Sequence, residues 1–316
     1  MKPHIIPLSL IILASAATVN AQQRDYEDVF YTEPIIEEFN GTASDYFSIP
    51  RDFRHFSDMP SFTEKSDDHV LIMRIDPEGP AGAGRGPEIA TKKRTHFGTY
   101  SARIRVPDVK KVQPNIGSVV GYFTYRMDPE FGLSEIDFEW LIADPRLIYI
   151  GTWTGYNDPG LNRIGRIINL ATGEIWNTIY RSADGIDHPI LVGTEPTTIE
   201  PIEGYDASKR FYEYGFDWQP DRLTWWVINP DTNEKIILWD YQGTEVFPGV
   251  PANTGVPVSP TTYLLNFWHT NNWPVDTNPN SIEKPAYPYT LEVDWMKYVP
   301  DVEASKKWIE ENGWDY

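Results

Sequence analysis

A pentapeptide that begins at Glu135 reads Glu-Ile-Asp-Phe-Glu, with a carboxylate at every second position and a large apolar side chain in each gap. Successive side chains of a β-strand point to opposite faces, so Glu135, Asp137 and Glu139 would share one face. Ile136 and Phe138 would take the other. A helix would turn Asp137 roughly 200° away from Glu135, and no acidic face would form. The pattern therefore predicts a strand that is acidic on one face and apolar on the other.

Three like charges along one strand face repel each other, so a purely structural strand would rarely keep them. Glycoside hydrolysis with retention needs two carboxyl groups about 5 Å apart. The α-carbons of Glu135 and Glu139 would lie about 13 Å apart in a strand. Side chains that lean inward would bring the carboxyl groups to roughly 5 or 6 Å. The spacing thus favours a retaining glycosidase, with Asp137 placed to hydrogen-bond one or both glutamates.

The first 21 residues have the layout of a secretory signal peptide, with an apolar run over 5–17 and small residues before a cleavage site expected after Ala21. We therefore expect a secreted or periplasmic protein. Residues 22–300 are expected to form a single catalytic β-sandwich domain, and 301–316 a short C-terminal tail with a weak helical pattern. No later segment reaches the roughly 20 apolar residues of a membrane span.

The formal net charge of −19, which loss of Lys2 with the leader would change to −20, argues against nucleic acid or an anionic membrane as partner. A neutral polysaccharide suits this charge, and we expect a monomer. The chain has no Cys and 6 scattered His residues, so it shows no zinc-ligand pattern. Aromatic residues make up 14% of the chain, and they suit both a sandwich core and stacking surfaces for sugar rings.

Short β-rich runs separated by Gly, Pro, Asn and Asp clusters predict an all-β sandwich. Two stretches, 169–208 and 246–260, are expected to be long loops, the first with a possible strand at Thr178–Arg181. The segment Val302–Asn312 is expected to be weakly helical, and either packed on the outside or frayed. The strand candidates are His69–Ile75, Gly98–Val106, Ser118–Tyr125, Glu135–Leu141, Leu147–Trp153, Arg210–Trp218, Leu223–Asn229, Lys235–Tyr241, Thr262–His269 and Tyr289–Val299.

Several segments resemble, in order and spacing, family 16 of the glycoside hydrolases. The resemblance covers roughly residues 90 to 299 and includes the acidic pentapeptide. The other segments are Gly-Thr-Tyr-Ser-Ala-Arg-Ile from Gly98, Asn-Ile-Gly-Ser from Asn115 leading into Tyr-Phe-Thr-Tyr from Tyr122, Phe-Asp-Trp-Gln-Pro-Asp from Phe216, Trp-Trp-Val from Trp225, Leu-Asn-Phe-Trp from Leu265 and Val-Asp-Trp-Met-Lys-Tyr from Val293.

This resemblance implies a concanavalin-like β-jelly roll of two curved antiparallel sheets, with the active site on the concave face. It implies that Glu135 is the nucleophile, Glu139 the general acid/base and Asp137 an assisting residue. The chain has the regular Glu-x-Asp-x-Glu form, as do lichenases, xyloglucan-active enzymes and fungal wall transglycosylases. A β-glucan substrate, mixed β-1,3-1,4 or β-1,3, is therefore expected.

Positions that face the cleft in relatives of this family match Asn115, Asn266 and Trp268, with Tyr122, or alternatively Phe123, nearby and Trp153 on the next strand. These five are the expected substrate-binding residues. The chain departs from lichenase-like members in other positions. Leu133 and Ser134 stand where Trp and Asp often precede the motif, and Tyr149 and Gly151 stand where Gln and Asn contact sugar. The linkage preference is therefore open.

Some members of the family hold a structural calcium, and the resemblance assigns Asp294 and a carbonyl of Gly98 as its ligands here. Catalysis is expected to need no cofactor. The expected activity is endo-acting hydrolysis of a β-glucan with retention. Transglycosylation on a wall glucan or xyloglucan, non-catalytic carbohydrate binding, and a calcium-binding or solvated acidic face remain alternatives. Only the acceptor distinguishes a transglycosylase from a hydrolase, and a binder would not need both glutamates.

Overall fold

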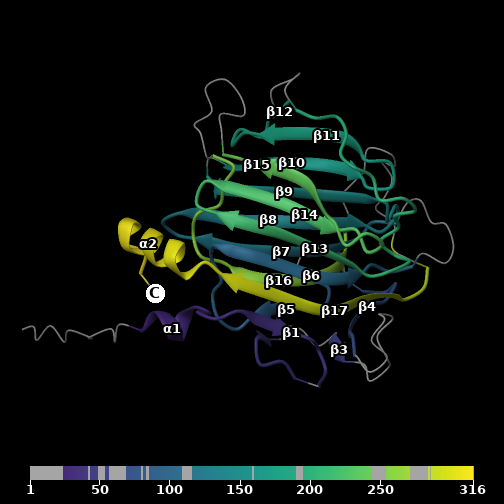
Figure 1. Ribbon diagram of the computed structural model, residues 1–316, viewed down its shortest axis with the longest axis horizontal. Helices are drawn as coiled ribbons and strands as arrows, with labels where there is room; N and C mark the ends of the chain where they lie inside the picture. The colour runs from purple at the N-terminus through teal and green to yellow at the C-terminus, as the bar shows by residue number, and fades with distance from the viewer. Residues whose placement is uncertain are drawn as a thin grey trace, which may run out of the picture.

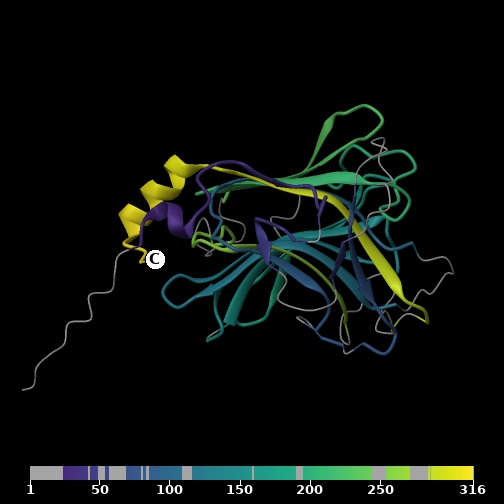
Figure 2. The same cartoon turned by 90° about the horizontal axis from the view of Figure 1, so that it is seen from below.

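In the computed structural model, two antiparallel sheets lie face to face (Figures 1 and 2). The predicted signal peptide and Asn115 lie outside the described residues. The structure describes residues 24–41, 43–48, 54–56, 69–79, 81–82, 85–108, 116–158, 160–189, 195–243, 254–270, 284 and 286–315.

The first sheet carries the acidic pentapeptide near its middle, on β8, with β7 and β9 as its neighbours. All pairs in this sheet are antiparallel. In spatial order its strands are β12 (Asp187–Pro189), β11 (Glu174–Arg181), β10 (Gly160–Asn169), β9 (Leu147–Tyr156), β8 (Gly132–Leu141), β7 (Ser118–Asp128), β16 (Thr262–His269), β5 (Glu88–Thr91) and β2 (Phe47–Ser48).

The second sheet covers the opposite side of the core and is also antiparallel. Strand β1 (Ile35–Glu37) pairs with β17 beside the main path of this sheet. The strands of the main path are β15 (Lys235–Tyr241), β14 (Arg222–Ile228), β13 (Tyr212–Gln219), β6 (Gly98–Arg105), β17 (Tyr289–Pro300), β4 (Leu71–Ile75) and β3 (Arg54–Phe56).

Aromatic rings from both sheets fill the space between them. Tyr100 stacks on Phe216 within the second sheet, with ring centroids 4.7 Å apart, and meets Tyr263 of the first sheet edge-on at 5.1 Å. Tyr263 donates a hydrogen bond to the hydroxyl of Tyr122 (3.1 Å). Phe138, which follows Asp137, stacks on Tyr122 at 5.7 Å. The strand that carries the carboxylates is therefore held on its inner face by a close-packed aromatic core.

Both helices lie at one end of the sandwich (Figure 1). α2 (Val302–Asn312) begins at Asp301, whose side chain accepts from the Ala304 N–H (3.0 Å), and ends at Gly313 with φ 65°. Its residue Ile309 is buried in a cluster with the short helix α1 (Tyr26–Val29). The helical prediction for the tail is confirmed, and the helix packs against the body of the protein. Within the described residues, no helix is both long enough and apolar enough to span a membrane.

The predicted all-β sandwich is confirmed, and the possible strand at Thr178–Arg181 is part of β11, which begins four residues earlier; β10 lay outside the predicted strands. The reason lies in β10, where an arginine takes an inward position. Arg166 is 2% exposed, stacks over the Trp239 ring at 4.3 Å and pairs with Glu195. A charged residue that faces the core breaks the alternation by which strands are recognised.

Candidate active site

The three carboxylates lie on one face of β8, as the alternation predicted. Ile136 and Phe138 are fully buried in the core, while Glu135 and Glu139 are half-buried on the opposite face and Asp137 is 6% exposed. Between Glu135 and Glu139 the register with both neighbouring strands continues without a shift, so this segment of strand is regular and carries no bulge.

The carboxylates line a pocket of about 400 Å³ on the outer face of the first sheet. Asn266 and Trp268 line it too, as the resemblance implied. The remaining lining residues come from β5, β7 and β16, and they are Glu88, Gly121, Phe123, Tyr125 and Leu264. A polymer that crosses the strands would therefore pass directly over the acidic face of β8.

Asn266 reaches towards Glu139 because the residue between them is glycine. The register places Asn266 opposite Gly121, and Gly121 opposite Glu139. A Cβ on Gly121 would lie 2.6 Å from the Asn266 Oδ1 atom. That oxygen is buried and accepts no hydrogen bond from the described residues. It is an acceptor placed to receive a donor from a ligand, such as a sugar hydroxyl.

The two expected tryptophan platforms occupy different places. Trp268 packs at one end of the pocket against the apolar cluster that includes Val119 and Leu141. Trp153 lies on β9 directly opposite Glu135, half-buried, and its ring is covered by the guanidinium of Arg163 at 5.2 Å. Trp153 is thus on the same sheet face as the carboxylates, beside the pocket.

The expectation that Tyr122 contacts substrate is wrong. Its side chain is fully buried between the sheets, where it packs on Phe138 and Tyr263. Successive residues of β7 alternate between faces, so Gly121 and Phe123 line the pocket instead. The sequence run of two adjacent aromatic residues did not reveal which of them faced outwards.

Electrostatics set the protonation of the carboxylates. Burial raises the pKa of Glu135, Asp137 and Glu139 above the ordinary carboxyl range, and the charge of Glu139 raises the pKa of Glu135 further. The positive charge of Arg163 acts in the opposite direction and lowers the pKa of all three. The cluster therefore retains protons at a pH where isolated carboxylates have lost theirs.

The predicted hydrogen bond from Asp137 to a glutamate is absent among the described contacts, and the charges of Glu135 and Glu139 add to burial in raising the pKa of Asp137. Its backbone is anchored from below, because the indole of Trp225 on β14 donates to the Asp137 carbonyl oxygen at 3.1 Å. Trp225 is itself fully buried. The opposite sheet thus holds the centre of the acidic strand in position.

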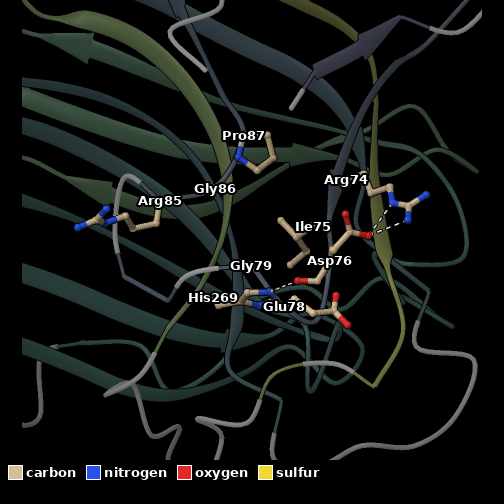
Figure 3. A pocket seen from close by; sticks show the side chains of 9 residues that line it. All are labelled: Arg74, Ile75, Asp76, Glu78, Gly79, Arg85, Gly86, Pro87 and His269. Atoms are coloured by element: carbon tan, nitrogen blue, oxygen red, sulfur yellow. Dashed lines mark hydrogen bonds and ion pairs between the residues drawn. The ribbon is translucent and has the colours of Figure 1, made fainter. Parts of the chain in front are cut away.

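A second cavity, of about 330 Å³, lies beside the end of β4 and contains none of the three carboxylates (Figure 3). His269 lines it, on the opposite face of β16 from Trp268. Its ring bonds to the Ser118 hydroxyl and to the Asp76 carbonyl oxygen, each at 2.9 Å. Burial lowers the pKa of His269. This histidine holds the strand ends together and does not face the acidic pocket.

The residues expected to hold calcium do not fit one ion. Gly98 pairs with Pro300, six positions along β17 from Asp294, so the two residues are roughly 20 Å apart. Ligands of one calcium lie within about 2.6 Å of it. The Asp294 carboxylate is also paired with the Arg103 guanidinium at 2.6 Å. Among the described residues, no group of three or more His, Cys, Asp or Glu side chains is arranged to hold a metal.

Comparison with known proteins identifies β-glucanases as relatives. A beta-glucanase of Paenibacillus polymyxa is 28% identical over 190 residues, and one of Paenibacillus macerans is 33% identical over 190 residues. Each alignment covers 60% of this chain and 56% of the relative, so the chain spans little more than half the length of these curated proteins. No family model matches the chain.

Solved structures share the fold. The Bacillus licheniformis beta-glucanase superposes with a TM-score of 0.51 at 18% identity, over 84% of this chain and 98% of that one. A lichenase from a mouse hindgut metagenome gives 0.50 at 18% identity, over 85% of this chain and 99% of that one. Fold and site define a β-jelly roll with a carboxylate-lined cleft. In sequence the chain is similar to β-glucanases over 60% of its length, and it shares the fold of two glucanases of known structure.

Proposed function

We propose that this protein is a secreted, retaining endoglycosidase that cleaves internal bonds of a β-glucan, either β-1,3-1,4 or β-1,3. The observation that supports it is the alignment of Glu135, Asp137 and Glu139 on one regular strand, in a pocket with Asn266 and Trp268. The names of the relatives, all β-glucanases, support the substrate class. The regular strand supports a lichenase-like subgroup.

In the proposed reaction the Glu135 carboxylate attacks the anomeric carbon as the bond to the leaving oxygen breaks. Glu139 gives its proton to that oxygen, and a covalent glycosyl-enzyme remains. Glu139 then takes a proton from water as the water oxygen attacks the same carbon, which frees Glu135. Two inversions at one carbon retain the configuration. Burial raises the pKa of Glu139 to about 7, which suits a proton donor near neutral pH, and raises the pKa of Glu135 to about 8, so Glu135 must lose its proton before it attacks.

Chemical rescue would test both roles. We expect Glu135→Ala to lose at least about 10³-fold in kcat. Azide should restore turnover of an activated β-glucoside and yield the α-glycosyl azide, because it attacks where the carboxylate is missing. Glu139→Ala with azide should yield the β-glycosyl azide from the covalent intermediate. If Glu135→Ala cleaves at the parent rate, or if the first product of the native protein has inverted configuration, the assignment is wrong.

Hydrolysis and transglycosylation differ only in the acceptor that reaches the intermediate. Tyr125 lines the pocket beside Glu135 and is 42% exposed, which gives an acceptor sugar an apolar surface on which to stack. Digests of defined glucan oligosaccharides, analysed by mass, would separate the two activities. Products longer than the starting oligosaccharide indicate transfer, and shorter products alone indicate hydrolysis, which we propose as the main activity.

A further inference from the structure

A bare strip of sheet lies beside the acidic strand. Asp137 on β8 is opposite Gly151 on β9, and Gly151 is opposite Gly165 on β10. These three strands are neighbours in the sheet (Figure 1). A Cβ on Gly151 would overlap the carbonyl oxygen of Ile164, so only glycine fits there. Two adjacent strands, a width of roughly 10 Å, therefore carry no side chain in line with Asp137.

Trp153 and Arg163 border this glycine floor. They are directly opposite each other, two residues along their strands from the two glycines, and the guanidinium stacks on the indole at 5.2 Å. The Arg163 side chain then bends along its own strand. Its Nε and Nη2 atoms lie 3.3 and 3.4 Å from the place that a Cβ on Gly165 would occupy. The guanidinium thus lies over the floor at the end remote from Asp137.

Arg163 has no hydrogen bond or ion pair with the residues that the structure describes, apart from its contact with the Trp153 ring. Its cross-strand neighbour Arg181 is held by both oxygens of Asp187, at 2.6 and 3.0 Å. The buried Arg166 is paired with Glu195. The guanidinium of Arg163 is half-buried, and its N–H groups donate no hydrogen bond to the described residues. It can therefore bind an anionic group with two parallel hydrogen bonds.

We propose that the glycine floor is a sugar subsite for a residue that carries a carboxylate or a sulfate, and that Arg163 binds that group while Trp153 borders the ring. The polysaccharide cleaved by this protein would then bear acidic substituents on the sugar that lies next to the catalytic strand. This inference rests on the proposed function only for the position of the scissile bond. A neutral sugar would leave the fork of Arg163 without a directly hydrogen-bonded anion.

Three substrates with the same backbone would test the subsite. Mixed-linkage β-glucan is compared with the same glucan oxidised at C6 to carry carboxylates, and with a sulfated preparation. We expect the native protein to have the higher kcat/KM on one of the acidic glucans, and the preferred glucan shows which acidic group is bound. Arg163→Gln should lower the ratio of acidic to neutral kcat/KM on the order of 10- to 100-fold. Each variant is assayed at its own pH optimum.

Arg181→Gln is the matched control, because it removes an equal charge from the same sheet face, one strand farther out. It should leave the acidic-to-neutral ratio at the native value. An Arg163→Gln protein that loses equally on neutral and acidic glucans would overturn the proposal, and so would a native protein that prefers the neutral glucan over both acidic ones. General loss of the fold is recognised by comparing the melting temperatures of the two variants.

A binding measurement tests the subsite independently of the proposed reaction. Calorimetry with the Glu135→Gln protein measures affinity for glucuronate-containing and sulfated β-gluco-oligosaccharides without turnover. We expect affinity for one of these oligosaccharides to fall as salt rises, and to be lost when Arg163→Gln is added. If neutral glucans are cleaved with retention but the affinity for acidic oligosaccharides does not depend on Arg163, the subsite proposal is wrong and the proposed function stands. If this affinity depends on Arg163 but Glu135→Ala remains fully active, the proposed function is wrong and the subsite proposal stands.

Discussion

At the scale of single residues, the buried carboxylate of Asp137 makes the folded protein less stable at neutral pH. Burial, and then the charges of Glu135 and Glu139, raise its pKa. Between the ordinary and the raised pKa, the folded state binds more protons than the unfolded state. Stability therefore falls as the pH rises through that window. The fold retains this group at the centre of the cleft despite its cost, which is typical of a functional residue.

We expect Asp137→Asn to raise the melting temperature, and the gain to grow as the pH rises above the ordinary pKa of an aspartate, because the variant has no carboxylate to ionise. Its kcat should fall. Asp240→Asn is a control for which we expect the opposite effect on stability, because the Arg222 guanidinium lowers the pKa of Asp240. That variant should be less stable at neutral pH, with a difference that shrinks in acid. An Asp137→Asn protein no more stable than the native one at any pH would contradict the account.

Arg163 should also shift the pH–activity profile, since its charge lowers the pKa of all three carboxyl groups. Arg163→Gln removes that charge, so the pKa of the nucleophile and that of the acid both rise. Both limbs of the kcat/KM profile on a neutral glucan should then move to higher pH. Arg181→Gln, whose charge is already paired with Asp187, should keep the native profile. A downward shift in Arg163→Gln would contradict this electrostatic role.

The shared face of the three carboxylates could be predicted from the sequence, because a period of two places them together whatever the strand pairs with. Asn266 and Trp268 followed from a resemblance and were confirmed as pocket residues. Tyr122 was assigned to the wrong face of β7, because the motif did not show which of two successive side chains points towards the pocket. Arg163 escaped prediction, since its position depends on a register that joins Gly165 to Gly151 across two strands.

At the scale of elements, the end of the chain fastens the hairpin that leads into β8. Trp314 follows α2 and is 6% exposed. Its indole donates to the Asp128 carboxylate at 2.8 Å, at the end of β7, and its ring packs against Phe30 at 5.7 Å. The Arg126 guanidinium lies 4.8 Å from the same ring. Both ends of the described chain therefore meet the turn between β7 and β8.

We expect Trp314→Ala to destabilise the protein by roughly 3 to 5 kcal/mol, because it empties a buried aromatic site and removes one of the hydrogen bonds that Asp128 accepts. Trp314→Phe keeps most of the ring and loses the hydrogen bond, so it should cost about 1 kcal/mol. Denaturant unfolding would measure both. Equal stability of Trp314→Ala and the native protein would show that the tail is only loosely attached.

The elements were predicted unevenly for physical reasons. Strands such as β15 and β16 match their predicted bounds, since each is a short run rich in apolar and aromatic residues. In β10 the inward Arg166 and the outward Ile167 reverse that pattern. A tertiary contact with Trp239 and Glu195 compensates the buried charge, and no local signal in the sequence reports such a partner.

At the scale of the whole molecule, the aromatic core joins the two sheets without disulfides, because the chain has no cysteine. The second sheet also holds its strands by ion pairs on its outer face. Arg103 bonds to Asp294 and Arg105 to Glu292, each at 2.6 Å. A guanidinium therefore takes the place beside Asp294 that a bound cation would need.

From this arrangement we expect stability to be independent of calcium. An ion present at a hundred times its Kd would add about 2.7 kcal/mol, which corresponds to several degrees in melting temperature. Dialysis against EDTA, followed by thermal unfolding with and without added calcium, should therefore leave the transition unchanged. Asp294→Ala should lower the melting temperature equally in both conditions, because it leaves Arg103 without its partner. A calcium-dependent rise in the native protein that is absent from Asp294→Ala would instead show that this carboxylate binds the ion.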